Sequence, residues 1–207
     1  MQNSLQRLGR EHIKPAADVL GRAFYDDPFI DVILPDLKKR DARIKYPFRF
    51  SVTMGVLYGE AYAISENLEG IAVWLHFPNK FRQNPFRVMR CAFRTRPWRM
   101  GLKAAQKGLP MEMITEKMHK KYVPSEHWYL ATLGVDPTQQ GKGIGSRLIK
   151  AMLPRIDEQN LPLYLETSTQ ENVHFYQRFG FNVMEKHTVP DTDMYIWAML
   201  RPPQTPP

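Results

Sequence analysis

Hydrophobic positions recur along the chain at two characteristic spacings. Ile13, Ala16, Leu20 and Phe24 lie on one face of a helix, whereas "GIAVWLHF" and "WYLATLGV" are short apolar runs typical of buried strands. By these criteria we expect helices at residues 11–24, 39–57, 143–159 and 172–180. We expect strands at residues 5–8, 60–65, 70–77, 128–135, 161–168 and 194–200. Strands that alternate with helices predict an α/β (α+β) domain, with a central sheet and helices on both faces.

Prolines and glycines predict where these elements end. Pro28 follows the first helix, and Pro154 is expected to end or kink the helix that begins near Gly143. A basic helical segment after residue 80 is expected to break near Pro97 and again at residues 108–110. Gly180 is the expected C-terminal cap of the helix at 172–180. We therefore expect one domain over residues 1–201, followed by a proline-rich tail at 202–207.

The composition is that of a folded globular protein, and a single cysteine, which allows no internal disulfide, fits a reducing compartment. The chain has 207 residues, of which 43% are hydrophobic and 12% aromatic, enough to build one sizeable core. Its first residues do not resemble a signal peptide, and no uncharged run approaches the length of a membrane span. Cys91 is the single cysteine and is expected to be a core residue. We expect a soluble, cytoplasmic protein without a membrane partner.

Positive charge is concentrated in the middle of the chain. The net charge is +8, and residues 80–121 contain twelve basic residues against two acidic ones. Such a segment could bind a nucleic acid, an acidic protein or a polyanionic ligand. The alternative is a solvated helical surface whose apolar side faces the protein. The residues of that expected apolar side are Phe86, Val88, Met89, Cys91 and Phe93. No zinc-finger, homeodomain or RNA-binding signature accompanies the charge, so we do not expect a nucleic-acid partner.

The stretch "GVDPTQQGKGIGSRLI" places three glycines between an expected strand and an expected helix. A Rossmann fingerprint fails, because the sixth residue counted from Gly141 is Ser146 and from Gly143 is Leu148. A P-loop fails as well, because Lys142 is followed by Gly143. Glycines at this place let backbone N–H groups converge beside a helix N-terminus, where a phosphate or pyrophosphate binds well. A tight turn without a ligand is the alternative.

Two segments together resemble a known family. "VDPTQQGKGIGSRLI" is similar to the pyrophosphate-binding loop of the GNAT superfamily of N-acetyltransferases, and "FYQRFGF" resembles the second signature of that family. "IAVWLHFP", "LPLYLETS" and the late "W-A-M" are most similar to the puromycin N-acetyltransferase type. The resemblance covers about the last 80 residues and the strand at 71–78, and it is poor over residues 80–126. It implies a GNAT fold, a mixed sheet with splayed central strands, and acetyl-CoA as co-substrate.

The resemblance also assigns a cofactor site. It implies that backbone groups of Leu133 and Val135 pair with pantetheine and that the glycine loop holds the pyrophosphate. The loop residues so assigned are Gln140, Gly141, Lys142, Gly143, Ile144, Gly145 and Ser146. Asn172 matches an asparagine of the puromycin type, although the commoner family asparagine falls at Thr169. Spacings typical of metal ligands are absent from the sequence, so we expect no metal.

Direct transfer to an amine requires a base and an acid. Tyr176 matches the catalytic tyrosine of the family and is the expected general acid for the leaving thiolate. The strand "HWYLATLGV" has no carboxylate, so the base is left open among Glu166, Glu60, His127 and a water chain. One cysteine without a recognisable partner argues against an acetyl-cysteine route.

These features predict an acetyl-CoA-dependent N-acetyltransferase that acts on a primary amine of a small molecule. A protein or peptide amine is the alternative acceptor. A non-catalytic CoA-binding protein is the alternative from another class, because a carboxylate is missing from the strand before the loop. A homodimer is left open.

Overall fold

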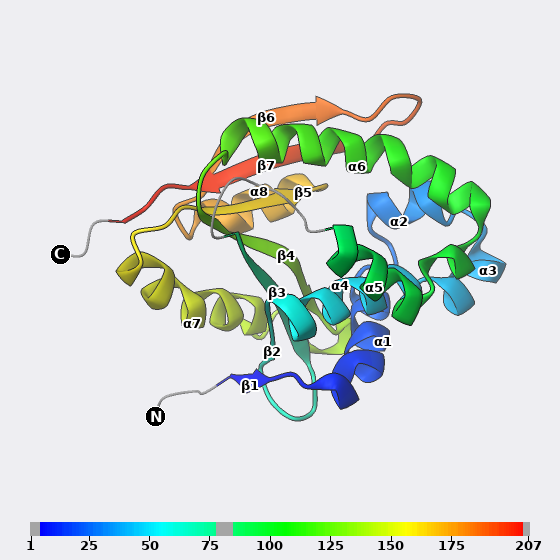
Figure 1. The fold of residues 1–207 in the computed structure, drawn as a ribbon, viewed down its shortest axis with the longest axis horizontal. Coiled ribbons are helices and arrows are strands. Elements are labelled where there is room, and N and C mark those ends of the chain that lie inside the picture. The colour runs from blue at the N-terminus through cyan, green and yellow to red at the C-terminus, as the bar shows by residue number, and fades with distance from the viewer. Residues whose placement is uncertain (1–4, 78–84, 205–207) are drawn as a thin grey trace.

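The computed structural model describes residues 5–77 and 85–204 (Figure 1). The strands are β1 (Gln6–Arg7), β2 (Glu60–Ala63), β3 (Gly70–Phe77), β4 (His127–Val135), β5 (Leu163–Thr167), β6 (Asn182–Thr188) and β7 (Tyr195–Arg201). The α-helices are α1 (Ile13–Ala23), α2 (Pro28–Ile33), α3 (Leu37–Arg43), α4 (Lys45–Tyr58), α5 (Pro85–Thr95), α6 (Leu102–Tyr122), α7 (Ile144–Glu158) and α8 (Gln170–Gln177). Short 3-10 helices are η1 (Arg10–His12), η2 (Pro97–Met100) and η3 (Pro137–Gln139).

The strands of the described chain form one mixed sheet in the order β1-β2-β3-β4-β5-β7-β6 (Figure 1). Neighbouring strands are antiparallel except β4 and β5, which are parallel. The six predicted strands all occur, each within two residues of its expected ends. This sheet, with helices on both faces, confirms the predicted α/β fold.

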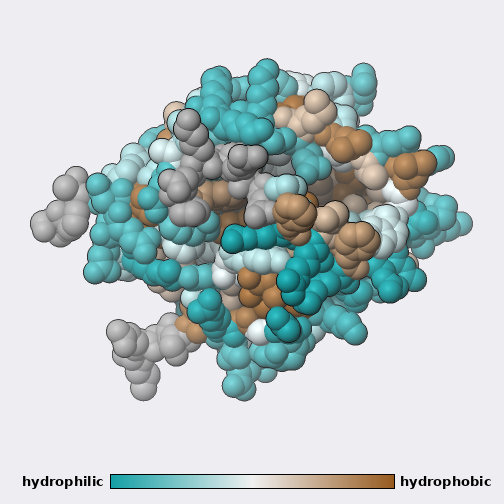
Figure 2. Space-filling model, in the orientation of Figure 1, coloured by the Kyte–Doolittle hydropathy of each residue, from teal (hydrophilic) through white to brown (hydrophobic). Residues whose placement is uncertain are grey.

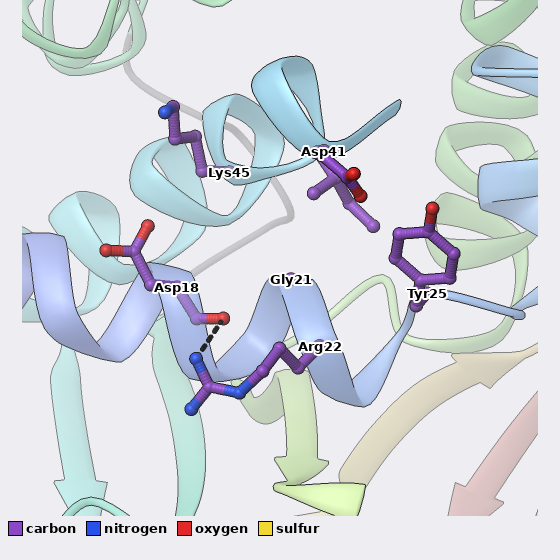
Figure 3. Close-up of a pocket in the computed structure, with 7 residues that line it drawn as sticks. Asp18, Gly21, Arg22, Tyr25, Asp41 and Lys45 are labelled. Carbon is purple, nitrogen blue, oxygen red and sulfur yellow. Dashed lines mark hydrogen bonds between the residues drawn. The ribbon is translucent and has the colours of Figure 1, made fainter. Parts of the chain in front are cut away.

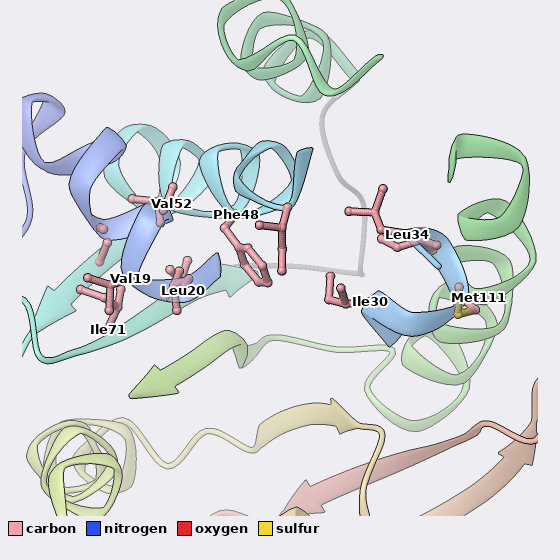
Figure 4. Packing of buried hydrophobic residues seen from close by; sticks show 14 of the residues in the cluster. Val19, Leu20, Ile30, Leu34, Phe48, Val52, Ile71 and Met111 are labelled. Carbon is pink, nitrogen blue, oxygen red and sulfur yellow. The ribbon is translucent and has the colours of Figure 1, made fainter. Parts of the chain in front are cut away.

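Different helices cover the two faces of the sheet. On one face, α1, α2, α4 and α6 pack over a core that includes Leu20, Ile30 and Phe48 (Figure 4). On the other face, α7 and α8 bury Leu148 and Val173 in a second core. Strands buried between two such layers carry apolar side chains on both faces, which explains the uninterrupted apolar runs in the sequence.

The predicted break at residues 108–110 is wrong, and Pro154 does not end its helix. α7 continues through Pro154 to Glu158, and α6 continues through Pro110 to Tyr122. Each proline removes one intrahelical hydrogen bond. Buried side chains lie on both sides of each proline, Met152 and Ile156 in α7 and Ala104 and Met111 in α6. Tertiary packing therefore holds each helix together across its proline.

The predicted helix over residues 39–57 is instead two helices, α3 and α4, which meet at Ile44. Pro47 has no N–H group to donate to the carbonyl of Arg43, and this position lies in the first turn of α4, where proline is tolerated. The last helix also differs slightly from its prediction, since α8 ends at Gln177 with Arg178 as its C-cap. Gly180 follows with a positive φ of 84°.

Strand β6 was not predicted from the sequence. It lies at the edge of the sheet and pairs with β7 alone. Its side chains are exposed or half-buried, so "NVMEKHT" lacks the apolar alternation of a strand with one buried face.

The connection between β3 and β4 contains α5, η2 and α6. The predicted break at Pro97 occurs between α5 and η2. Cys91 is buried as expected, in a small core with Met54, Leu75 and Phe77. For the other residues of the expected apolar side the prediction is wrong. Phe86, Met89 and Phe93 are exposed, and Val88 is only half-buried. α6 runs back along the sheet and contacts α2, β6 and β7 (Figure 1). None of the described helices combines the length and apolarity needed to cross a bilayer.

Candidate active site

Strands β4 and β5 separate after a short stretch of pairing. Their pairs are Trp128 with Leu163 and Tyr129 with Tyr164. β4 nevertheless continues to Val135 and β5 to Thr167. Beyond the paired residues, the edge of β4 that faces β5 has no strand partner within the described chain. We call this part of β4, residues 131–135, the open edge.

A β-bulge alters the backbone direction just where the open edge begins. Val73 pairs with Thr132 and Trp74 with Leu130, so Ala131 is an extra residue in β4. In a regular antiparallel strand, the N–H and C=O groups of successive residues point alternately to the two neighbouring strands. One extra residue shifts that alternation by one position.

The shift turns Leu133 and Val135 toward the open edge. Before the bulge, the N–H group of Trp128 donates to the carbonyl of the residue preceding β5, at 2.9 Å. After the bulge, the N–H group of Asp136 donates in the opposite direction, to the carbonyl of Glu69 beside β3, at 2.8 Å. Because Asp136 points toward β3, the backbone groups of its neighbour Val135 and of Leu133 point away from it. Two hydrogen-bonding residues of β4 are thereby presented where a strand partner is missing.

The glycine loop connects the open edge to α7. Gly141 and Gly143 have φ values of 77° and 73°, in the left-handed region that favours glycine. A Cβ atom at either position would meet nothing within 4 Å. Gly143 is the N-cap of α7 and has no side chain to accept hydrogen bonds from the first turn. The backbone N–H groups from Gly141 to Ser146 donate to no described residue. These donors lie together at the positive end of the α7 dipole.

Two polar side chains of the loop hydrogen-bond to neighbouring residues of the chain. The Gln140 amide nitrogen donates to the carbonyl of Val135 at 3.2 Å, and the Lys142 ammonium donates to the side chain of Gln139 at 2.8 Å. Both side chains are exposed, so Lys142 adds positive charge beside the unpaired N–H groups. Ile144 is buried in the second core and fixes the start of α7 against the sheet.

Gly145 and Ser146 form the first turn of α7. A Cβ atom on Gly145 would lie 3.4 Å from the Phe175 ring and 3.7 Å from a methyl group of Val135. Gly145 therefore marks where α7 comes close to both the open edge and α8. Ser146 is half-buried and follows directly.

Tyr176 lies on α8, in the same core as Ile144. Its ring packs edge-on against Phe175 and Phe181, with centroid distances of 5.2 Å and 5.7 Å. Burial alone raises its pKa above the ordinary value, with no contribution from a hydrogen bond or a charge. Tyr176 therefore keeps its proton at neutral pH, and the described fold makes no use of its hydroxyl group.

Glu166 lies on the opposite face of the sheet, close to where β4 and β5 separate. It shares that face with Tyr164, two residues before it on β5. The Tyr129 hydroxyl donates to Glu166 Oε2 at 2.8 Å. Burial raises the pKa of Glu166 to about 7, although the hydrogen bond from Tyr129 acts in the other direction. A carboxyl group with this pKa exchanges protons readily near neutral pH.

Comparison with protein families agrees with this geometry. The model of the "Acetyltransferase (GNAT) family" matches residues 72–181, more than half of the chain. The chain belongs to the GNAT acetyltransferase family. An uncharacterized N-acetyltransferase of Schizosaccharomyces pombe is 26% identical, with 97% of this chain and 83% of that protein aligned. Mycothiol acetyltransferase of Propionibacterium freudenreichii is 40% identical over 25% of this chain and 18% of its own length. This GNAT protein is accordingly an acyltransferase.

Solved structures show the same fold. A Corynebacterium glutamicum structure described as "histone acetyltransferase HPA2 and related acetyltransferase" superposes with a TM-score of 0.66 and 23% identity over 98% of both chains. Mosquito arylalkylamine N-acetyltransferase-like 5b gives a TM-score of 0.58 and 12% identity, over 96% of this chain and 99% of that one. Members of the GNAT family generally use acetyl-CoA.

The other two candidate bases of this GNAT acetyltransferase have structural partners. Glu60 accepts hydrogen bonds from Arg155 at 2.7 Å and Tyr62 at 2.8 Å, which together hold its pKa below the ordinary value despite burial. His127 is fully buried, and its Nδ1 atom lies 2.6 Å from the carbonyl of Ser125. Its Nε2 atom lies 2.7 Å from Nε2 of His119. Burial lowers the pKa of both histidines, that of His119 to about 3, so both rings are neutral at pH 7.

Asn172 lies in the first turn of α8. Its backbone N–H group donates to the Thr169 hydroxyl at 3.2 Å, and Thr169 is the N-cap of that helix. The position where the commoner family asparagine would fall therefore caps α8 here.

The sequence analysis missed a clamp on the glycine loop. Asp136 accepts from the backbone N–H of Thr138 at 3.1 Å and from its hydroxyl at 2.7 Å. Arg22 on α1 donates to the same carboxylate at 2.6 Å and 2.9 Å. "DPT" is a local capping pattern that the sequence displays, but the link to Arg22 spans 114 residues and has no sequence signal.

A pocket beside α1 is separate from the glycine loop, Tyr176 and Glu166. α1, α3 and α4 surround it, and Tyr25, Asp41, Lys45 and Asp18 line it together with Arg22 (Figure 3). It contains none of the loop residues, Tyr176 or Glu166. Within residues 5–77 and 85–204, no group of three or more metal-binding side chains comes together.

Proposed function

We propose that this protein is an acetyl-CoA-dependent N-acetyltransferase that transfers the acetyl group directly to the primary amine of a small molecule. The observation that carries the proposal is the open edge of β4, with Leu133 and Val135 facing it, next to a loop of unpaired N–H groups. Pantetheine contains amide groups that pair with such an edge as an added strand would. A diphosphate fits the N-terminus of α7.

The residues of the loop suit a diphosphate in both shape and charge. The positive φ values of Gly141 and Gly143 bring consecutive N–H groups to one side, and the open space above them leaves room for an anion. Lys142 adds a positive charge. The clamp of Asp136 by Arg22 holds the start of the loop in place before any ligand binds.

We assign proton transfer to two side chains that lie on opposite faces of the sheet. When bound, acetyl-CoA supplies the acetyl group as a thioester. Glu166, with a pKa of about 7, takes a proton from the ammonium group of the acceptor and leaves a neutral amine. Tyr176 donates its hydroxyl proton to the departing thiolate. Cys91 is buried in a different core, which favours direct transfer over an acetylated cysteine.

The surroundings of Glu166 favour a small acceptor. His119 on α6 packs against Tyr129 and Tyr164, with ring centroids 4.7 Å and 4.5 Å apart. α6 therefore covers the face of the sheet on which Glu166 lies. A folded protein would have to displace α6 to reach the carboxylate, whereas a small amine would not. The resemblance to the puromycin type makes puromycin the first acceptor to test.

The proposal is tested by measuring the release of free CoA from acetyl-CoA across a panel of amines. The panel contains puromycin, aminoglycosides, polyamines and peptides. We expect turnover with a small amine, and we expect saturating acetyl-CoA to raise the melting temperature, since it binds the folded chain. The absence of any shift with acetyl-CoA or CoA would refute the cofactor assignment. Turnover with peptides alone would refute the small-molecule acceptor.

The glycine loop gives a second test, of affinity. Gly143→Ala is expected to weaken acetyl-CoA binding about tenfold, because a Cβ atom disfavours the positive φ that directs the N–H groups. Gly180→Ala is a matched control, since Gly180 has a φ of 84° and lies outside the loop. Both variants should lose about 1–2 kcal/mol of stability. Isothermal titration of each variant separates the two effects, and equal affinities would show that the loop does not hold the ligand.

A further inference from the structure

The connection between β3 and β4 carries an apolar surface that the fold leaves exposed. Large hydrophobic side chains are exposed along α5, η2 and the first part of α6. They include Met89 (50% exposed), Phe93 (68%), Trp98 (55%) and Leu102 (76%). Figure 2 shows hydrophobic side chains gathered over this part of the molecule, with hydrophilic ones around them. Single exposed apolar residues are ordinary, but a cluster of this kind marks a binding surface.

The helical positions on α5 show that this exposure is regular. Met89 and Phe93 are four residues apart and therefore lie on one side of the helix. Cys91, which α5 buries, lies about 160° around the helix from each of them. Arg90 and Arg94 each lie about 100° around the helix, in the same direction, from the apolar residue before them, so they border the exposed apolar side along one edge. α5 thus has a buried side, an exposed apolar side and arginines between them.

Exposed apolar side chains continue beyond α5 into η2 and α6. The rings of Phe93 and Trp98 meet edge to face at 6.3 Å, so η2 extends the exposed apolar side of α5. Leu102 begins α6 four residues after Trp98. We call the exposed residues Met89, Phe93, Trp98 and Leu102 the apolar stripe.

The segment of the chain that carries the apolar stripe has no acidic residue. No aspartate or glutamate occurs from Gly70 to Met111. The basic residues of α5, η2 and the first part of α6 are Arg87, Arg90, Arg94, Arg96, Arg99, Lys103 and Lys107. None of them forms an ion pair with a described residue. This positive charge is therefore not neutralised within the described fold.

We propose that the apolar stripe and its basic residues bind the surface of an anionic phospholipid bilayer. Phe, Trp, Met and Leu side chains suit the boundary between headgroups and acyl chains, and arginine and lysine bind anionic headgroups. Exposed apolar side chains next to basic ones on a helix surface are typical of a segment that binds at the membrane interface. The proposal concerns attachment without a spanning helix, and it replaces the expectation of no membrane partner.

Charge and polarity argue against two other occupants. A symmetric dimer would place this surface against itself, and the seven basic residues would face seven more. A nucleic acid would engage the arginines through its phosphates but would leave the aliphatic part of the apolar stripe, Met89 and Leu102, without an equivalent contact.

Vesicle sedimentation with the full chain tests the proposal. The probes are vesicles of phosphatidylcholine alone and vesicles of phosphatidylcholine mixed with phosphatidylglycerol. We expect the anionic vesicles to bind at least about tenfold more protein, with partial loss of binding as salt is raised. Equal binding to both vesicles, or binding to neither, would overturn the proposal.

Paired variants separate the apolar stripe from its charge. Phe93→Ser with Trp98→Ser, and separately Arg90→Gln with Arg94→Gln, should each lower binding to anionic vesicles about tenfold. The matched control is Val183→Ser with Met184→Ser on β6, which are also exposed and should leave binding unchanged. All these side chains are on the surface, so the melting temperature should change little in each variant.

Two further results would overturn the proposal. If the serine variant keeps full vesicle binding while the glutamine variant loses binding to vesicles and duplex DNA alike, the surface is a polyanion site without membrane preference. If size-exclusion chromatography shows a dimer that the serine variant dissociates, the apolar stripe is covered by a second copy.

Discussion

Replacing Tyr176 with phenylalanine is expected to lower kcat by about 100-fold or more while the affinity for acetyl-CoA changes little. General acid catalysis contributes about 10²–10⁴-fold, and the substitution removes only the hydroxyl group. The ring contacts with Phe175 and Phe181 are kept, so the core around α8 should stay intact. The measurement is the rate of CoA release at saturating substrates, together with titration calorimetry for acetyl-CoA.

Tyr46→Phe provides the matched control for this experiment. Tyr46 is also buried but lies on α4, and the control loses a tyrosine hydroxyl outside the site. Its kcat should equal that of the wild type. A Tyr176→Phe enzyme with unchanged kcat would remove Tyr176 from the role of general acid.

Glu166→Gln is expected to lower kcat/KM by about 100-fold or more and to abolish a pH dependence centred near 7. Burial raises the pKa of this carboxyl to about 7, and only its deprotonated form accepts a proton. In the wild type the rate should therefore rise with pH below about 7 and level off above it, until the amine itself titrates. The glutamine variant has no group to titrate in this range. The measurement is a pH profile of kcat/KM with one fixed acceptor.

Two variants sharpen the assignment of the base. Glu60→Gln should keep both the rate and the pH profile, because Glu60 is engaged by Arg155 and Tyr62. Tyr129→Phe removes a hydrogen bond that lowers the pKa of Glu166, so the midpoint of the profile should move to higher pH. Persistence of the inflection near pH 7 in Glu166→Gln would assign it to another group.

Local patterns accounted for most of the secondary structure. Strands such as β3 were predictable because both of their faces are buried, which leaves an apolar run in the sequence. The prolines of α6 and α7 misled the prediction, since propensity describes an isolated helix and these two are held by buried side chains. β6 escaped prediction because its pairing with β7 leaves no buried face.

For the candidate site, too, the sequence singled out some features and not others. The glycine loop at residues 140–146 is contiguous in the sequence, and so is the "FYQRFGF" segment that contains Tyr176. The sequence alone was therefore enough to single out both segments. Burial raises the pKa of Glu166, and the Tyr129 hydroxyl that acts against this rise lies 37 residues away. No pattern in the sequence predicts the contact between Tyr129 and Glu166.

By itself, the sequence determined most of the strands and helices, the glycine loop with its family signature, and the concentration of positive charge in residues 80–121. These are properties of neighbouring residues and survive in any arrangement of the chain. The tertiary structure alone decided three others. The bulge at Ala131 turned Leu133 and Val135 to the open edge, and folding brought Glu166 beside Tyr129. It also left the apolar stripe outside the core. Each of these features depends on contacts between residues far apart in the sequence, and those contacts form only when the whole core packs.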